Sequence, residues 1–234
     1  MEFSYAAELK KRFTCYGHFY ELLLMNGETA KCRSVLEIVD ATVPRDDLAA
    51  IAEMTPDVVV IMMNPGSSRP KVEGHVDERI DYPRANPAAR KQLVLTQPDN
   101  TQYQVMRVAV EKNWSHVRVL NLSDLRDPKS GGFIQKVAAL SGVMGGHSHS
   151  MFRPERTAEL ERSLRRKTRT PILLGWGQNP ELLPLVEQCL ERIAGEPTVT
   201  VPSDVHPLLN AHPSPMLQKK KIEWLETILK AVDG

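Results

Sequence analysis

The sequence lacks several features that mark whole classes of protein. It has no run of about 18 apolar residues, and its most apolar stretch, Val58 to Met63, is only as long as a strand, which argues against a membrane-spanning helix. Its amino terminus has no basic segment followed by a long apolar core, so we expect no secretory signal. Only 6% of residues are aromatic, while 41% are hydrophobic and 25% charged, an ordinary globular balance. We therefore expect a soluble, cytoplasmic protein with no membrane partner.

Cysteine and net charge are also scarce. The three cysteines, Cys15, Cys32 and Cys189, are widely spaced and form no CxxC pair, which argues against a disulfide framework, a thiolate zinc site or an iron–sulfur cluster. Thirty basic and 29 acidic side chains give a formal net charge of +1. Bulk charge therefore does not indicate a polyanionic partner, although short basic runs remain, among them residues 219–221.

The chain is predicted to form a single domain over residues 1–234, with residues 1–44 as an amino-terminal extension. Residues 13–40 read as a β-hairpin around Asn26-Gly27, a dipeptide that tolerates the positive φ angles of a type I′ turn. Beyond the extension, short β-branched runs alternate with helical patterns. The predicted strands are 57–63, 116–121, 171–175 and 198–201, and the predicted helices are 45–54, 101–113, 133–140, 154–167, 180–193 and 216–232, with a further helical segment near 88–95.

This alternation predicts an α/β fold. Right-handed crossovers place helices on both faces of a parallel sheet. We therefore expect a three-layer sandwich with a central, mainly parallel four-stranded sheet flanked by helices, plus the amino-terminal β-hairpin. Reactive groups of such folds gather in loops at the carboxyl ends of the strands. Those loops read MMNPGSS, VLNLSDL, LLGWGQN and NAHPSPM, which predicts one site built from four loops.

In that order, the four loops resemble motifs of the uracil-DNA glycosylase superfamily. Asn64-Pro65-Gly66 resembles the water-activating motif in the form found in the mismatch and thymine-DNA branch (GINPG), whereas the uracil-specific branch has GQDPYH. His212-Pro213-Ser214-Pro215 resembles the HPSPLS loop, and the stretches 120–121 and 173–177 resemble the base-reading and LLWG segments. The similarity spans roughly residues 57–217 and leaves out the hairpin and the loops after Ser67 and Gly131.

The resemblance implies two catalytic residues and no metal or cofactor. His212 would donate a hydrogen bond to the departing pyrimidine as negative charge develops on it, an electrostatic role worth about 3 kcal/mol. Asn64 stands where the uracil-specific branch has aspartate, and because an amide is no general base it would only orient the attacking water, so turnover would be slower. The alternative to these catalytic roles is a structural one: Asn64 would only form a turn, and His212 would only cap a turn.

Three further residues are expected to contact the base. Gly66 replaces a tyrosine that blocks substituents on carbon 5 of the pyrimidine, so a bulky base would fit; alternatively, glycine satisfies only the backbone. Asn121 would read the Watson–Crick edge, or else is a buried amide bonded to backbone. Tyr82 is the candidate aromatic residue on which the base would stack; alternatively, it is an ordinary surface tyrosine.

DNA contacts are expected around the same loops. Met216 stands in the place of the family's leucine wedge, although it could instead begin the core face of the last helix. Backbone N–H groups around Ser67, Ser68 and Ser214 are candidates to grip phosphates, with Lys219 and Lys220 close to the same strand. His147 and His149 lack further ligands at metal spacing, so we interpret GGHSHS as a mobile loop rather than a metal site.

The sequence thus predicts a monofunctional, monomeric DNA glycosylase that flips and excises a modified pyrimidine and leaves an abasic site. Some superfamily members resemble defence enzymes that remove bulky modified cytosines, such as glucosylated hydroxymethylcytosine, from phage DNA, and this substrate class is the leading hypothesis. No lysine near the motifs is suited to Schiff-base chemistry, so strand cleavage is not expected. The alternatives are a repair glycosylase for mismatched uracil or thymine, and a non-catalytic protein that binds modified bases.

Overall fold

The β-branched run after Asp57 forms the centre of the sheet. The computed structural model describes residues 3–24, 26–81, 92–143, 146–168 and 170–234. In it, β3 (Val58–Met62) is buried along its whole length. Alternate side chains enter two different cores: Val59 and Ile61 one, and the remaining three residues the other. A strand covered on both faces has this continuous apolar sequence because neither of its faces meets water.

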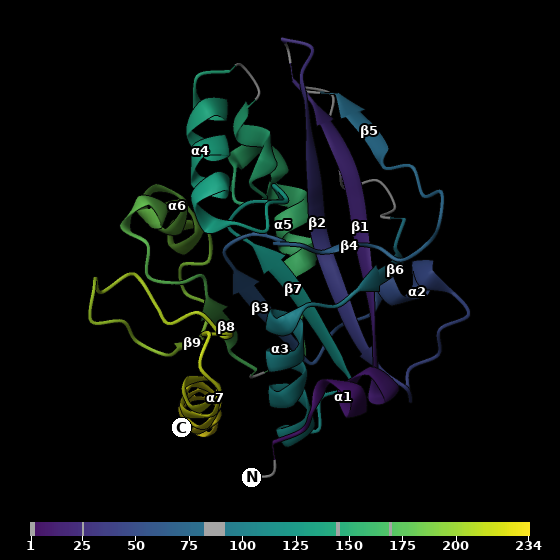
Figure 1. Ribbon diagram of the computed structural model, residues 1–234, viewed down its shortest axis with the longest axis vertical. Coiled ribbons are helices and arrows are strands. Elements are labelled where there is room, and N and C mark those ends of the chain that lie inside the picture. Colours follow the sequence, from purple (N-terminus) through teal and green to yellow (C-terminus); the bar gives the residue numbers. More distant parts are fainter. Residues whose placement is uncertain (1–2, 25, 82–91, 144–145, 169) are drawn as a thin grey trace.

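The four strands predicted for the parallel sheet lie side by side. β3 pairs in parallel with β7 (His116–Asn121) and with β8 (Ile172–Gly175), and β8 pairs in parallel with β9 (Thr198–Thr200). Their carboxyl ends meet at the same edge (Figure 1). The structure therefore brings the loops after β3, β7, β8 and β9 to one end of the molecule.

The sheet is larger and more mixed than predicted. The hairpin of β1 (Phe13–Leu23) and β2 (Thr29–Asp40) is not an appendage, because β2 pairs antiparallel with β7 and continues the sheet. This pairing covers the edge of β7, whose N–H and C=O groups would otherwise lack partners. Three strands from the passage after Ser67 add to β1: β6 (Val94–Gln97) with β4 (Arg69–Pro70) beyond it, and β5 (Glu78–Asp81). The described residues form nine strands in this sheet, so the four-stranded prediction was wrong in extent.

Two local predictions also fail. A type I′ turn needs positive φ at both central residues. Gly27 has a φ of +85°, but Asn113 is the one non-glycine residue with positive φ in the part of the chain that the structure describes, so Asn26 does not meet this condition. The helical segment expected near 88–95 ends in strand β6 instead, and residues 82–91 lie outside the described residues.

Helices cover both faces of the sheet (Figure 1). One core receives side chains from four helices: α2 (Leu48–Glu53), α4 (Ser130–Ser141), α5 (Thr157–Leu164) and α6 (Leu183–Arg192). The other receives side chains from three: α1 (Ala6–Arg12), α3 (Asn100–Glu111) and α7 (Gln218–Asp233). The seven helices of the described residues thus form two outer layers on a mixed sheet, and α1 had not been predicted.

The cysteines belong to these cores. All three are buried free thiols, and burial raises the pKa of Cys15 to about 12. Such thiols pack as small apolar side chains and are unreactive as nucleophiles. Among the described residues, no helix is both long and apolar enough to cross a membrane.

Candidate functional site

Asn64 follows β3 in a loop that is tied to the loop after β7. The backbone N–H of Leu122 donates to the carbonyl oxygen of Met62 at 2.8 Å. The Asn64 amide nitrogen donates to the carbonyl oxygens of Asp127 at 2.9 Å and Leu125 at 3.4 Å. Because the amide nitrogen is committed to these acceptors, Oδ1 is the group that Asn64 can offer to a water molecule.

His212 lies in the loop between β9 and α7. The side chains of two tryptophans hold the loop: Trp176 Nε1 donates to the carbonyl oxygen of Leu208 and Trp224 Nε1 to that of Ala211, both at 3.1 Å. The backbone N–H of Ser214 donates to Nδ1 of His212 at 3.1 Å. Since Nδ1 accepts, the neutral imidazole carries its proton on Nε2, which makes Nε2–H a hydrogen-bond donor.

Gly175, the last residue of β8, lets this loop approach the sheet. A Cβ at position 175 would lie 2.8 Å from Cγ of Pro213, closer than such atoms approach in real structures. We expect Gly175→Ala to push Pro213, and with it His212, out of place and to lower about 10- to 100-fold the rate of any reaction in which His212 takes part. The overpacking should cost about 1–3 kcal/mol of stability. Single-turnover rates and urea unfolding measure the two effects.

The control for this change is Gly142→Ala. Gly142 has no neighbouring atom within 4 Å of an added Cβ and an ordinary φ of −88°. It should leave both the rate and the stability nearly unchanged. Equal rates for Gly175→Ala and the wild-type protein would show that the Pro213 contact does not position His212.

Asn64 and His212 line one cavity of about 800 Å³. The loops after β3, β7 and β8 and the loop before α7 all contribute to its wall. The predicted site residues among the lining are Asn64, Gly66, Ser67, His212, Ser214 and Met216. The loops that were predicted to form one site thus line one cavity.

The same cavity contains a carboxylate that the sequence analysis missed. Asp99 caps α3: its Oδ1 accepts from the backbone N–H groups of Thr101 at 2.9 Å and Gln102 at 3.2 Å. Its Oδ2 is not used in the cap and faces Gly66, where an added Cβ would lie 3.5 Å away. Burial lowers the pKa of His212, and the negative charge of Asp99 opposes part of that shift. An acid–base group therefore accompanies the Asn64 amide.

Gly66 also lines a second cavity. Its φ of +61° lies in the left-handed region that favours glycine, so a backbone requirement is real. A cavity of about 590 Å³ shares Gly66, Ser67 and Pro128 with the first and continues past them toward Leu125 and Arg126. Gly66 therefore borders both cavities without placing a side chain in either.

Asn121 does not line either cavity. It is buried at the end of β7, behind Asn64, and one orientation of its amide satisfies both neighbours. In that orientation Nδ2 donates to the backbone oxygen of Asn64 at 3.1 Å and Oδ1 accepts from Nη2 of Arg33 at 3.2 Å. Arg33 does line the cavity, and sequence reasoning had not selected it.

Of the residues expected to contact DNA, Ser67, Ser214 and Met216 line the cavity, whereas Ser68, Lys219 and Lys220 do not. The N–H groups of Ser68 and Ser214 are used inside the protein, donating to the carbonyl oxygen of Pro65 and to His212, so neither is available to a phosphate. Ser68 lines the second cavity rather than the first. Met216 lines the cavity and is 96% exposed, which rules out its alternative role in the core of the last helix.

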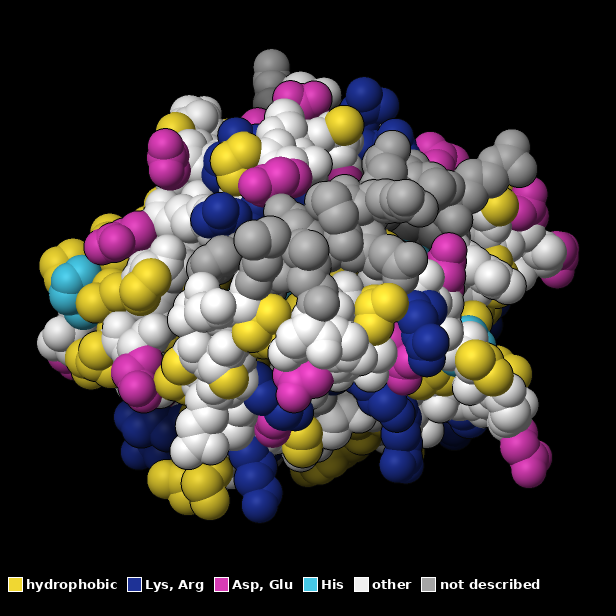
Figure 2. Space-filling view, turned by 90° about the horizontal axis from the view of Figure 1, so that it is seen from above, with side chains coloured by type: hydrophobic (Ala, Val, Ile, Leu, Met, Phe, Trp, Pro, Cys, Tyr) yellow, Lys and Arg dark blue, Asp and Glu magenta, His cyan; other side chains and the backbone are white. Residues whose placement is uncertain are grey.

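The basic residues of this region lie at the start of α7. Lys219 and Lys220 are exposed in its first turn. Lys220 forms an exposed ion pair with Glu223 at 2.7 Å and lines a neighbouring hollow that His212 also borders. Elsewhere charge is mixed: Figure 2 shows acidic and basic side chains interspersed over the face seen from above. A single large basic surface is not visible on that face.

Two further predictions concern Tyr82 and the GGHSHS segment. Tyr82 lies outside the described residues, and among the described residues Trp176 is the Phe, Tyr or Trp side chain that lines the cavity. The segment interpreted as a mobile loop contains a short 3-10 helix, Gly146–His149, in which His149 is buried, and its mobility stays a prediction. The described residues contain no group of three or more side chains suited to holding a metal ion.

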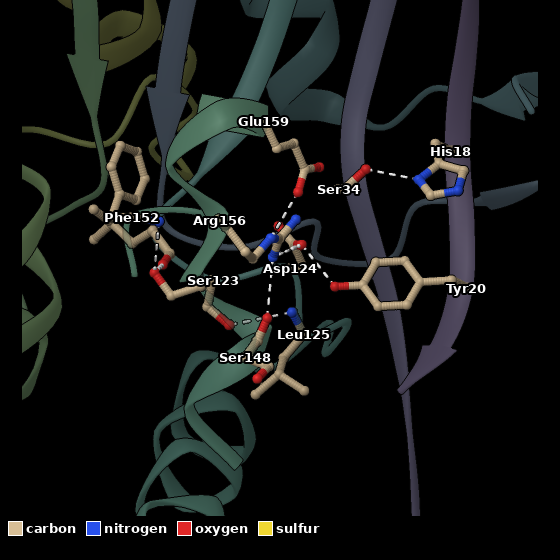
Figure 3. Close-up of polar contacts among 12 residues, drawn as sticks. His18, Tyr20, Ser34, Ser123, Asp124, Leu125, Ser148, Phe152, Arg156 and Glu159 are labelled. Carbon is tan, nitrogen blue, oxygen red and sulfur yellow. Dashed lines mark hydrogen bonds and ion pairs between the residues drawn. The ribbon is translucent and has the colours of Figure 1, made fainter. Parts of the chain in front are cut away.

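A buried ionic cluster holds the loop after β7 (Figure 3). Arg156 donates to Asp124 at 2.6 Å, to Glu159 at 2.8 Å and to the carbonyl oxygen of Ser148 at 3.1 Å, and Tyr20 donates to Asp124 at 2.7 Å. Burial alone would lower the pKa of Arg156, but the two carboxylates raise it well above its ordinary value. The cluster joins β1, the loop after β7 and α5, and so ties Asp124, in the loop that follows Asn121, to the interior.

Comparison of the chain with protein-family models, with curated protein sequences and with solved structures gives no match.

Proposed function

We propose that this protein is a monofunctional DNA glycosylase of the uracil-DNA glycosylase type, acting as a monomer on a flipped pyrimidine that carries a large substituent on carbon 5. The observation that carries the proposal is the single cavity that holds Asn64, Asp99 and His212 together. The motif resemblance selected two of these residues, and Asp99 supplies the carboxylate that the motif lacks. Exposed Met216 at the rim supports base flipping, because an apolar wedge has to fill the vacated stack.

The residues divide the chemistry between them. The glycosidic bond breaks with both electrons going to the base, where Nε2–H of His212 donates to the developing negative charge. Oδ1 of Asn64 holds a water molecule against the opposite face of the sugar. As the water oxygen bonds to the sugar carbon, its proton passes to the Asp99 carboxylate. The released base anion takes up a proton from solvent, and Asp99 returns its proton to solvent. The products are the free base and an abasic site, and the strand stays intact.

The second cavity supports the choice of substrate. A base seated beside Asn64 and His212 with its carbon 5 toward Gly66 would direct a substituent into the adjoining 590 Å³. Modified cytosines such as glucosylated hydroxymethylcytosine of phage DNA are therefore the first candidates, and defence against phage is the corresponding role. Arg126 and Lys136 in the lining supply donors for hydroxyl groups.

The decisive experiment is direct. The protein is incubated with phage genomic DNA carrying natural base modifications and, in parallel, with duplexes containing uracil, a thymine mismatch or unmodified cytosine. We expect release of a modified base, identified by its mass, together with alkali-labile sites. Release of uracil or mismatched thymine alone would instead identify a repair glycosylase. A shift of labelled DNA without any abasic site would identify a non-catalytic binder of modified bases.

Replacing Asn64 with alanine should abolish most single-turnover excision while DNA binding persists. The change removes the Oδ1 acceptor for the attacking water, whereas the rim residues that contact DNA remain. Loss of the bonds to Leu125 and Asp127 should cost only about 1 kcal/mol each. Single-turnover rates and electrophoretic mobility shift are measured together, and unchanged excision would remove this role from Asn64.

The excision rate should also depend on pH through His212. Burial keeps the pKa of its imidazole below the usual 6.5, so the ring is neutral at and above that pH. Protonation at lower pH puts a proton on Nδ1, which then opposes the N–H of Ser214, so both the loop geometry and the stability linked to it are lost as pH falls. We expect a His212-dependent decline only below pH 6.5. Glutamine donates a hydrogen bond but does not titrate, so His212→Gln should excise more slowly at every pH and should not show this decline. An identical decline in the variant would contradict the assignment.

A further inference from the structure

Arg33 is a charged residue in the middle of a buried strand. The pairing of β1 with β2 shifts register there: His18 pairs with Val35, Phe19 with Arg33, and Ser34 is the extra residue. Such bulges re-aim side chains and are common next to functional sites. Arg33 is 0% exposed, yet it lines the cavity that holds Asn64 and His212.

The guanidinium of Arg33 has more donors than partners. Nη2 donates to Oδ1 of Asn121, but neither Nε nor Nη1 has a hydrogen-bond partner among the described residues. No described carboxylate forms an ion pair with Arg33 within 4.0 Å either; Asp99 and Asp124 act on it only from a longer range. A buried, charged donor without an acceptor is costly, so its presence beside a cavity indicates a ligand that supplies acceptors.

We propose that Arg33 binds the base itself. This inference rests on the proposed glycosylase function and narrows its substrate: the guanidinium donates to adjacent acceptors on the base and stabilises the negative charge that the base acquires when its bond to the sugar breaks. Arg33 stays protonated throughout, because desolvation lowers its pKa only to about 10. No proton transfer from Arg33 is needed, and its contribution is electrostatic.

The hydrogen-bonding groups around Arg33 favour a cytosine-type ring. Oδ1 of Asn121 is committed to Arg33 and Nδ2 to the Asn64 backbone, so this corner of the site offers donors and no unused amide oxygen. Cytosine has two neighbouring acceptors, O2 and N3. Uracil and thymine carry a hydrogen on N3, which would face the guanidinium donor to donor. The site should therefore prefer an amino-pyrimidine to its keto counterpart with the same carbon-5 group.

The test compares two duplexes that differ only in this edge, one with 5-hydroxymethylcytosine and one with 5-hydroxymethyluracil. The wild-type protein should excise the cytosine member at least about 10-fold faster in single turnover. In Arg33→Met, cytosine excision should fall roughly 10- to 100-fold, whereas uracil excision changes less than about 3-fold, so the preference disappears. Arg33→Lys, which keeps the charge but not the planar fork, should lie between them.

A binding measurement makes the result independent of catalysis. The same two bases on non-cleavable 2′-fluoro sugars should show the same preference in affinity, lost in Arg33→Met. Arg107→Met is the matched control, since Arg107 is also buried but donates to Ser4 and Gln104 away from the cavity. Equal losses for both bases, or a wild-type preference for the uracil member, would overturn the role of Arg33. Binding selectivity without release of either base would overturn the proposed function and leave the role of Arg33 intact. If Arg33→Met does not fold, the ratio of cytosine to uracil excision rates in Arg33→Lys decides the test.

Discussion

Replacing Asp99 with asparagine should lower the single-turnover rate of base excision at least about 100-fold without destabilising the protein. Asparagine caps a helix as well as aspartate does, so the bonds from Thr101 and Gln102 to Oδ1 should persist. What the change removes is the charge and basicity of Oδ2, the atom that faces Gly66 and the cavity. General-base catalysis typically contributes 10²–10⁴-fold, which sets the expected loss.

The matched control for Asp99→Asn is Asp47→Asn. Asp47 caps α2 in the same way, with Oδ1 accepting from Ala49 at 2.9 Å and Ala50 at 3.1 Å, but it is exposed and lines no cavity of the site. Both variants should unfold at nearly the wild-type urea concentration, and only Asp99→Asn should lose excision. If Asp99→Asn excised the base at the wild-type rate, Asp99 would act only as a helix cap, and Asn64 alone would orient the attacking water.

Replacing Arg156 with methionine should destabilise the protein by about 3–5 kcal/mol. The variant keeps a side chain of similar length but leaves the carboxylates of Asp124 and Glu159 in the interior without their guanidinium. An uncompensated buried charge costs far more than the pair itself contributes. Urea unfolding followed by circular dichroism measures the change, and a loss of under about 1 kcal/mol would show that the cluster is not the support of the β7 loop.

The contrast with Lys220→Met isolates burial as the cause. Lys220 and Glu223 have the same three-residue spacing as Arg156 and Glu159, and nearly the same N···O distance, 2.7 Å against 2.8 Å. Both partners at the surface are well exposed, so water already solvates each charge. Lys220→Met should leave the unfolding midpoint unchanged.

Periodicity predicted the central part of the fold well. The four parallel strands are where apolar β-branched runs predicted them, because a strand between two helical layers has to be apolar on both faces. The extent of the sheet was not predictable in the same way. Whether a hairpin stands apart or joins the edge of β7 depends on pairing between residues 36–39 and 116–119, which no local pattern records.

The sequence also predicted only part of the candidate site. Asn64 and His212 were selected by short motifs at strand ends, and the fold brings both to one cavity. Asp99 was missed although a signal existed: Asp99 and Gln102 form a capping box that marks the start of α3. A capping box says that a helix begins, not that it begins beside Gly66. Arg33 carried a weaker signal, a charged residue inside a predicted strand, and its placement beside the cavity depended on the unpredicted register shift between β1 and β2.

The left-handed backbone at Gly66 has a consequence for how substrate range can evolve. A tyrosine wall that rejects large bases could not arise here by substitution alone, because a bulky side chain at a φ of +61° carries a conformational cost of about 1–3 kcal/mol. Asparagine is the side chain that this backbone tolerates best. Under the proposed function, a change that narrows the range of accepted bases at this position would therefore first require a different conformation of this turn.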